Sequence, residues 1–139
     1  MPTNKEFAIR LEDHPGTLGK VCQALADRGV NLIAFQAAPS QEGKNMIRVV
    51  VDNPTNAKSV LDSQHLTYTQ TEVAQVRLAN RAGELARAAT KLGDSNININ
   101  YAYCGLESGT NAPVLIFGVT DASKAATILD QVAAGAAGR

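Results

Sequence analysis

The chain repeats its own pattern after about half its length, and this repeat constrains the fold more than any other feature. An offset of 67 positions places residues 7–38 on residues 74–105. The identical pairs are Arg10 with Arg77, Leu11 with Leu78, Gly16 with Gly83, Leu18 with Leu85, Leu25 with Leu92, Asp27 with Asp94 and Asn31 with Asn98. After a loop that is one residue longer in the second copy, an offset of 68 continues the match from Ile47, Val49 and Val51 to Leu115, Phe117 and Val119. The chain of 139 residues therefore consists of two copies of one small unit.

Each copy has the pattern of a strand, a helix, two strands and a second helix. In the first copy, apolar residues alternate with polar ones over residues 7–11, which is typical of a half-buried strand. Apolar residues then recur at helical spacing from Leu18 to Leu25, after a turn in which Asp13 or His14 caps the helix and Pro15 fits its first turn. The other predicted elements are strands at 30–38, 46–51, 74–78, 97–103 and 114–120, with helices through 57–61, 85–92 and 125–132.

The two copies differ at their ends. Residues 66–72 predict one more strand in the first copy, and no Gly, Pro or Asn separates them from the strand at 74–78. We therefore expect a single long strand to link the copies. The second copy has no counterpart of this strand and ends in residues 133–139, whose Ala- and Gly-rich sequence predicts a fraying tail.

Composition and charge fit a folded protein that binds neither nucleic acid nor a membrane. Hydrophobic residues make up 45% of the chain and charged residues 19%, as in globular proteins. Thirteen basic residues balance thirteen acidic ones, aromatic residues are 4% and Trp is absent, so the basic surface and stacking platforms that nucleic acids require are missing. The first residues are polar, and no apolar run reaches the roughly 18–20 residues of a membrane span. We expect a cytoplasmic protein.

The sequence carries no pattern that predicts catalysis or a cofactor. It lacks a nucleophile motif of the G-x-S-x-G type, a phosphate-binding Gly-rich loop and a paired-carboxylate signature. His14 and His65 lie in unrelated segments without a second His or a Cys at ligand spacing, so we expect no metal site. Cys22 lies on the apolar stripe of its helix, which predicts a small buried side chain. We expect neither enzyme activity nor a cofactor.

Two short motifs give each copy a resemblance to a known family. Residues 13–18 read Asp-His-Pro-Gly-Thr-Leu, and residues 29–32 read Gly-Val-Asn-Leu. The first motif resembles the segment between the first strand and first helix of ACT domains, and the second resembles the start of their second strand. Residues 79–85 and 96–99 are a weaker copy of the two motifs.

The resemblance covers nearly the whole chain as two ACT domains, at residues 1–72 and 73–139. It implies an α+β fold of two ferredoxin-like βαββαβ repeats, whose antiparallel sheets carry their helices on one face. The second repeat lacks its last strand. If the second strands of the two repeats pair within one chain, a monomer suffices, whereas strand edges left exposed favour a homodimer.

The resemblance also implies a function, because ACT domains are typically regulatory modules that bind amino acids or similar small effectors. A chain of two such domains looks like a stand-alone sensor that holds its effector at the domain or subunit interface, near the loops that follow the first strands. Such a sensor signals the effector level to a partner protein, and we expect it to be a homodimer. The alternative is a regulatory subunit that binds no small molecule and only docks on an enzyme of amino-acid metabolism.

The candidate binding residues lie in the two matched motifs. Backbone N–H groups near Gly16, Thr17 and Leu18 suit a carboxylate, and Asp13 supplies the charge for an ammonium group. The full set is Asp13, Pro15, Gly16, Thr17, Leu18, Asn31 and Leu32, with Asn80, Gly83, Glu84, Leu85, Asn98 and Ile99 in the second copy. Six of these residues have a structural alternative: a helix cap for Asp13 and Asn80, a plain turn for Pro15 and Gly16, and a backbone hydrogen bond for Asn31 and Asn98.

Overall fold

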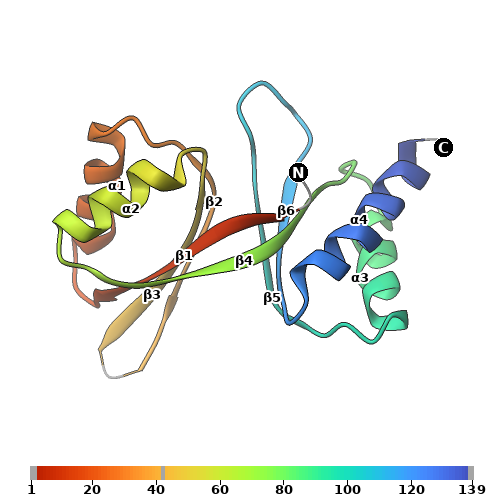
Figure 1. Ribbon diagram of the computed structural model, residues 1–139, viewed down its shortest axis with the longest axis horizontal. Helices are drawn as coiled ribbons and strands as arrows, with labels where there is room; N and C mark the ends of the chain where they lie inside the picture. Colours follow the sequence, from red (N-terminus) through yellow and green to blue (C-terminus); the bar gives the residue numbers. More distant parts are fainter. Residues whose placement is uncertain (1–2, 42, 138–139) are drawn as a thin grey trace. The chain divides into compact units, whose positions relative to one another are not determined.

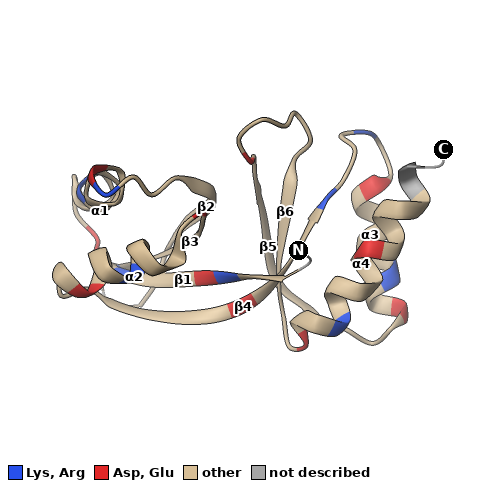
Figure 2. Ribbon diagram, turned by 45° about the horizontal axis from the view of Figure 1, so that its top comes forward, with Lys and Arg blue, Asp and Glu red and all other residues tan. Residues whose placement is uncertain are grey.

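The computed structural model describes residues 3–41 and 43–137 and divides the chain into two compact units. One unit is Lys5–Thr71, and the other combines the chain from Glu72 onward with Thr3 and Asn4. Basic and acidic residues are interspersed along the helices and strands of both units (Figure 2). Within the described residues, no helix combines the length and the apolar character needed to cross a membrane.

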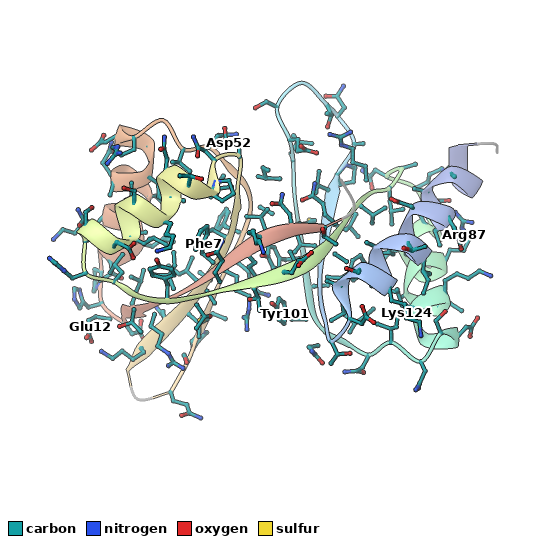
Figure 3. All side chains as sticks on the ribbon, in the orientation of Figure 1. Phe7, Glu12, Asp52, Arg87, Tyr101 and Lys124 are labelled. Carbon is teal, nitrogen blue, oxygen red and sulfur yellow. The ribbon has the colours of Figure 1, made fainter. Side chains whose placement is uncertain are left out.

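The first unit contains a three-stranded antiparallel sheet with two helices packed on one face (Figure 1), and residues 67–71 of a further strand that continues into the second unit. Its elements are β1 (Thr3–Glu12), α1 (Thr17–Asp27), β2 (Leu32–Pro39), β3 (Lys44–Val51) and α2 (Pro54–Ser63). The central strand β3 pairs with both neighbours, so Val49 lies opposite Phe7 of β1 and Phe35 of β2. Alternate residues of β1 and β3 face the helices, and the core is built from Phe7, Ile9, Leu11, Val21, Leu25, Val30, Ile47, Val49, Val51, Ala57, Val60 and Leu61 (Figure 3).

The second unit repeats this arrangement with β4 (Thr67–Arg77), α3 (Glu84–Asp94), β5 (Ile99–Gly105), β6 (Val114–Val119) and α4 (Ala122–Ala137). The central strand is β6, whose Phe117 lies opposite Ala74 of β4 and Ala102 of β5. Helices α3 and α4 pack over it, and the core is built from Ala74, Val76, Leu78, Ala88, Leu92, Ile97, Phe117, Ala125, Ala126, Leu129 and Val132. The antiparallel α+β architecture expected from the sequence is thus present.

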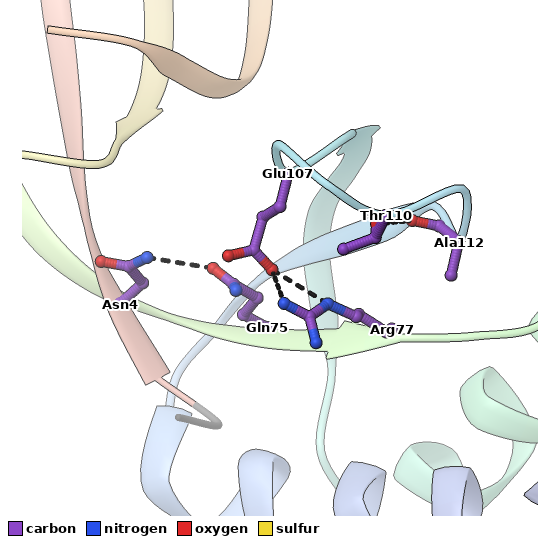
Figure 4. Close-up of polar contacts among 6 residues, drawn as sticks. All are labelled: Asn4, Gln75, Arg77, Glu107, Thr110 and Ala112. Atoms are coloured by element: carbon purple, nitrogen blue, oxygen red, sulfur yellow. Dashed lines mark hydrogen bonds and ion pairs between the residues drawn. The ribbon is translucent and has the colours of Figure 1, made fainter.

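Two long strands belong to both units. The prediction of a single strand across the junction of the copies is confirmed, because β4 runs without interruption from Thr67 in the first unit to Arg77 in the second. Strand β1 also crosses, since its first residues group with the second unit. There the side-chain amide of Asn4 donates a hydrogen bond to Oε1 of Gln75 on β4 at 3.0 Å (Figure 4). The start of the chain therefore contributes to the unit for which the sequence predicts no strand after its last helix.

The C-terminal tail differs from its prediction. Residues 133–137 continue α4 instead of fraying, while residues 138 and 139 lie outside the described residues. Val132 is buried in the second core, and its carbonyl accepts a hydrogen bond from Nη2 of Arg87 on α3 at 3.3 Å. Alanine also has the highest intrinsic helix propensity. The tail prediction gave the two glycines more weight than the alanines, and this is why it was wrong.

The prediction of the first helix cap is wrong as well. The N-cap of α1 is Gly16, so neither Asp13 nor His14 caps the helix, and Pro15 lies in the turn before it. The matched helix α3 has Gly83 as its N-cap, so Asn80 is not a cap either. Helix α2, in contrast, has a side-chain cap: Pro54 occupies its first turn, and the Asn53 side chain accepts the N–H of Asn56 at 3.0 Å.

Candidate functional site

Both loops that precede the first helix of a unit place a left-handed glycine at the helix start. Gly16 has φ 94° and ψ −13°, and Gly83 has φ 92° and ψ −16°, so the two copies share one backbone conformation. This region of φ strongly favours glycine, because a Cβ atom is strained there. Within the described residues, neither helix start receives a side-chain cap. The first N–H of each helix instead donates to a backbone carbonyl, Thr17 to His14 at 3.5 Å and Glu84 to Arg81 at 3.3 Å.

In the first loop, the Asp13 carboxylate is tied to the hairpin between β2 and β3. Its Oδ1 accepts a hydrogen bond from Nδ2 of Asn45 at 3.1 Å, and its backbone N–H donates to the carbonyl of Gly43 at 2.9 Å. Thr17 closes the loop from the other side, since its hydroxyl lies 3.0 Å from the carbonyl of Glu12 and 3.1 Å from that of His14. The loop is thus held by Asn45, which the sequence patterns did not single out.

The second loop carries a buried carboxylate at the first residue of the helix that follows it. Glu84, the first residue of α3, lies where the first copy has Thr17 and is buried. Its Oε1 lies 3.5 Å from Nη2 of Arg81, and its Oε2 lies 3.1 Å from Nη2 of Arg87. Both arginines are three residues from Glu84, a helical spacing that could have been read from the sequence. A negative charge from the chain itself therefore lies at the start of α3.

Three of the predicted residues of the second copy line one pocket of about 220 Å³. They are Asn80, Glu84 and Leu85, and the side chain of Leu85 is 53% exposed. Cys104 of β5 and Leu115 of β6 contribute further walls. The lining does not include Gly83, Asn98 or Ile99, so only half of the six predicted residues of the second copy meet at this pocket.

In the first copy, Thr17 lines a larger pocket of about 380 Å³, together with Glu12 and Lys44. The Nζ of Lys44 forms an ion pair with the Glu12 carboxylate, and this hydrogen bond and charge lower the pKa of Glu12. Asp13, Pro15, Gly16, Leu18, Asn31 and Leu32 are not part of the lining of this pocket. Leu18 and Leu32 instead pack, partly buried, against the first core.

The two matched asparagines make structural contacts near the starts of their strands. The backbone of Asn31 exchanges two hydrogen bonds with Asp52, since its N–H donates to Oδ1 at 2.9 Å and its carbonyl accepts the Asp52 N–H at 3.0 Å. In the second copy, Nδ2 of Asn98 donates to Oδ1 of Asn100 at 2.9 Å. Leu32 and Ile99, which follow the asparagines, pack partly buried against the two cores.

Side chains that could hold a metal ion together do not cluster in the described part of the chain. Among residues 3–41 and 43–137, no cluster of three or more His, Cys, Asp or Glu side chains could hold a metal ion. Cys22 is half-buried rather than fully buried, and burial raises the pKa of its thiol. A raised thiol pKa keeps this sulfur protonated and poorly reactive at neutral pH.

Comparison with solved structures gives the same fold over nearly the whole chain. The chain is similar to protein BT0572 from Bacteroides thetaiotaomicron, with 25% identity, a TM-score of 0.81 and coverage of 93% of this chain and 88% of that chain. It also shares its fold with the ligand-free regulatory subunit of aspartate kinase from Thermus thermophilus, at 16% identity and a TM-score of 0.66, with 94% and 90% covered. The regulatory subunit of aspartate kinase from Thermus flavus is 18% identical to this chain, with a TM-score of 0.61. The match covers 95% of this chain and 93% of that chain.

A search of curated proteins finds no match. A family comparison does: residues 2–133 match the ACT domain pair. This range includes both left-handed glycine loops, both cores and all four helix starts. The chain therefore belongs to the ACT domain pair family.

Proposed function

We propose that this chain is a regulatory protein that binds an amino acid, or a similar small effector, at the loops before α1 and α3. The observation that carries the proposal is the pair of left-handed glycines, Gly16 and Gly83, at two equivalent helix starts without a side-chain cap among the described residues. The N–H groups and positive dipole end of such a helix start suit a carboxylate. The exposed Asp13 beside the first glycine offers a negative charge for an ammonium group.

The difference between the two loops favours the first one as the tighter site. Glu84 already supplies a carboxylate at the start of α3, where it interacts with Arg81 and Arg87. The Glu84 carboxylate therefore already interacts with the positive dipole end of that helix, in the role that we propose for an effector carboxylate. In the first loop the equivalent residue is Thr17, which carries no charge, so the helix start of α1 is available to an anion.

In this proposal the effector lies between paired domains or subunits, and the two ACT domains are residues 1–72 and 73–139. The effector then regulates only if it binds one arrangement of these domains more tightly than another. We further propose that the protein is a cytoplasmic homodimer and that the partner it regulates is an enzyme of amino-acid metabolism. The family membership supports a regulatory role, since the chain matches the ACT domain pair over residues 2–133.

A second candidate function is docking on such an enzyme without any small effector. It is favoured by the likeness to two regulatory subunits of aspartate kinase, because the chain covers 90% and 93% of these subunits. Phe35 of β2 adds to this, since its side chain is 55% exposed on the strand. A large exposed aromatic side chain is a common anchor of protein interfaces.

The test is a thermal-shift screen of the full chain against the common amino acids at millimolar concentration. An effector at 100 times its Kd stabilises the protein by about 2.7 kcal/mol, which moves the melting temperature by several degrees. Asp13→Ala should abolish the shift. Asn45→Ala is the matched control, because it removes the same Asn45–Asp13 hydrogen bond but keeps the carboxylate.

A flat screen contradicts effector binding and favours the docking function, which co-purification with an enzyme partner then tests. Unchanged affinity in both Asp13→Ala and Gly16→Ala rules out the first loop as the binding site. If instead Asp13→Ala and Asn80→Ala weaken binding equally, the two loops contribute alike and the preference for the first loop is wrong.

A further inference from the structure

The pocket of the first unit that Thr17 lines has the size and the walls of a small-molecule site. Its volume is about 380 Å³, and it lies between the end of β1, the start of α1 and the connection from α2 to β4. Small-molecule sites begin at about 300 Å³ and combine apolar walls with a few polar groups. The apolar walls here are Leu11, Val21 and Leu66. A short aliphatic chain therefore fits against one side of the pocket.

The other walls of the pocket carry an excess of positive charge. Arg10, Lys20 and Lys44 are cationic, and Glu12 is the one carboxylate among the residues that line it. The Glu12 carboxylate forms its ion pair with Lys44. Within the described residues, Arg10 and Lys20 take part in no ion pair. Two cations thus line the pocket without an acidic partner from the chain.

The second copy shows how the equivalent arginine is satisfied. Arg10 corresponds to Arg77 in the repeat, and Arg77 lines a smaller pocket of about 280 Å³ together with Glu107 and Asp130. The guanidinium of Arg77 donates twice to Oε1 of Glu107, from Nε at 3.0 Å and from Nη2 at 2.5 Å (Figure 4). Ser40 stands at the position of Glu107 when the offset of 67 is extended two residues beyond the matched range 7–38. Among the described residues, Arg10 thus has no ion pair that corresponds to the one between Arg77 and Glu107.

We infer that the pocket of the first unit binds a small dicarboxylate. One carboxylate accepts from Arg10, as Glu107 does from Arg77, and the other is held by Lys20. The aliphatic chain between them contacts the apolar walls formed by Leu11, Val21 and Leu66. The net charge of the lining, two positive, matches that of the dianion. This site adjoins the proposed effector loop at Thr17 but uses other charged groups, Arg10 and Lys20.

The experiment is calorimetric titration of the full chain with succinate. Arg10→Gln and Lys20→Gln should each raise the Kd by about tenfold or more, because each loses a charge-assisted hydrogen bond. Arg77→Gln is the matched control, since this arginine is already held by Glu107, and it should leave the Kd unchanged. Asp13→Ala should also leave it unchanged, which separates this site from the proposed amino-acid site.

Three results overturn the inference. The first is the absence of succinate binding to the wild-type chain. The second is a Kd that Arg10→Gln does not change, or that Arg77→Gln raises equally. The third is a Kd for inorganic phosphate as low as that for succinate. The apolar walls would then contribute nothing to binding, and the pocket would select ligands by charge alone. An amino-acid response that persists while succinate fails to bind leaves the proposed effector function intact.

Discussion

The ring of Tyr101 on β5 lies directly against Gly118 on β6. The two residues are paired in the register of the sheet, and a Cβ atom added to Gly118 would overlap the ring, 2.6 Å from its Cε1 atom. The ring also stacks on Tyr103, with centroids 6.4 Å apart and an angle of 10° between the planes. The equivalent pair of the first copy is Ala34 and Val50, again matched in register. The larger side chain of the pair thus lies on β5 in the second copy, and on the central strand β3 in the first copy.

This relationship predicts that Gly118→Ala destabilises the protein by about 1–3 kcal/mol, because the added methyl overpacks against the ring. In a double-mutant cycle, Tyr101→Ala should cancel part of this cost, which denaturant unfolding can measure. Gly93→Ala is the control, since its position in α3 has open space around the added Cβ, and it should be neutral or stabilising. Additive effects of Gly118→Ala and Tyr101→Ala would contradict the proposed overlap.

The left-handed helix starts predict a second stability effect. Gly16→Ala should cost about 1–2 kcal/mol, because φ near +94° strains a residue with a Cβ even where no atom lies close to it. Gly19→Ala, three residues further along α1, should instead stabilise by up to about 1 kcal/mol, because Gly19 lies inside the helix. Urea denaturation of the two variants measures both changes in the free energy of unfolding. Equal effects of the two substitutions would show that the φ of Gly16 imposes no strain.

The carboxylate of Asp62 provides a pH-dependent prediction. A hydrogen bond from the Tyr68 hydroxyl at 2.6 Å and another from Lys58 at 3.0 Å lower its pKa from the ordinary value of 3.8. Because the pKa is lower in the folded state, this interaction stabilises the fold above the ordinary value, and the stabilisation is lost as the pH falls through the folded pKa.

Tyr68→Phe isolates the stronger of these two interactions. The Tyr68 ring makes an edge contact with Phe7, with centroids 5.7 Å apart, and phenylalanine keeps this contact while removing the hydroxyl. The Asp62 pKa, measured by NMR titration, should therefore rise toward 3.8. Tyr103→Phe in the second unit serves as the control and should leave it unchanged. A Tyr68→Phe variant with an unaltered Asp62 titration would show that the hydroxyl does not bond this carboxylate.

The ion pair of Arg77 and Glu107 predicts a local effect on the segment between β5 and β6. Glu107→Gln should speed hydrogen exchange of residues 106–112, because Arg77 anchors this segment to β4. Global stability should change by less than about 1 kcal/mol, since the Arg77 side chain is 54% exposed. Faster exchange in β6 as well would instead mean that the ion pair supports the whole sheet.

The sequence predicted the elements well, because helical and strand periodicities record which side chains face a core. Val60 and Leu61 of α2, or Val49 and Val51 of β3, are buried as their spacing indicates. It did not predict the role of Gly16, since the left-handed φ that makes it the N-cap depends on the path of the whole turn. The partner of Asn31 was also missed, because Asp52 lies 21 residues away and only strand pairing brings the two together.

The candidate site was predicted less completely than the fold. Asn80, Glu84 and Leu85 line one pocket, while Asn31, Leu32, Asn98 and Ile99 contact other parts of their units. A matched motif in two copies identifies residues that share a backbone environment, but it does not show which of them face a common space. The sequence patterns did not indicate the pocket around Arg10 and Lys20, because its walls come from four separate segments and only Thr17 among them belongs to a motif.

The continuous course of β4 has a consequence for how such a protein can be divided. The two copies meet in the middle of a strand, so no linker separates them there. A cut at residue 72 would leave the first half with a truncated strand and deprive the second half of Thr3 and Asn4. Neither half then holds all the residues of its unit, so we expect either half, made alone, to be less stable than the same unit within the whole chain.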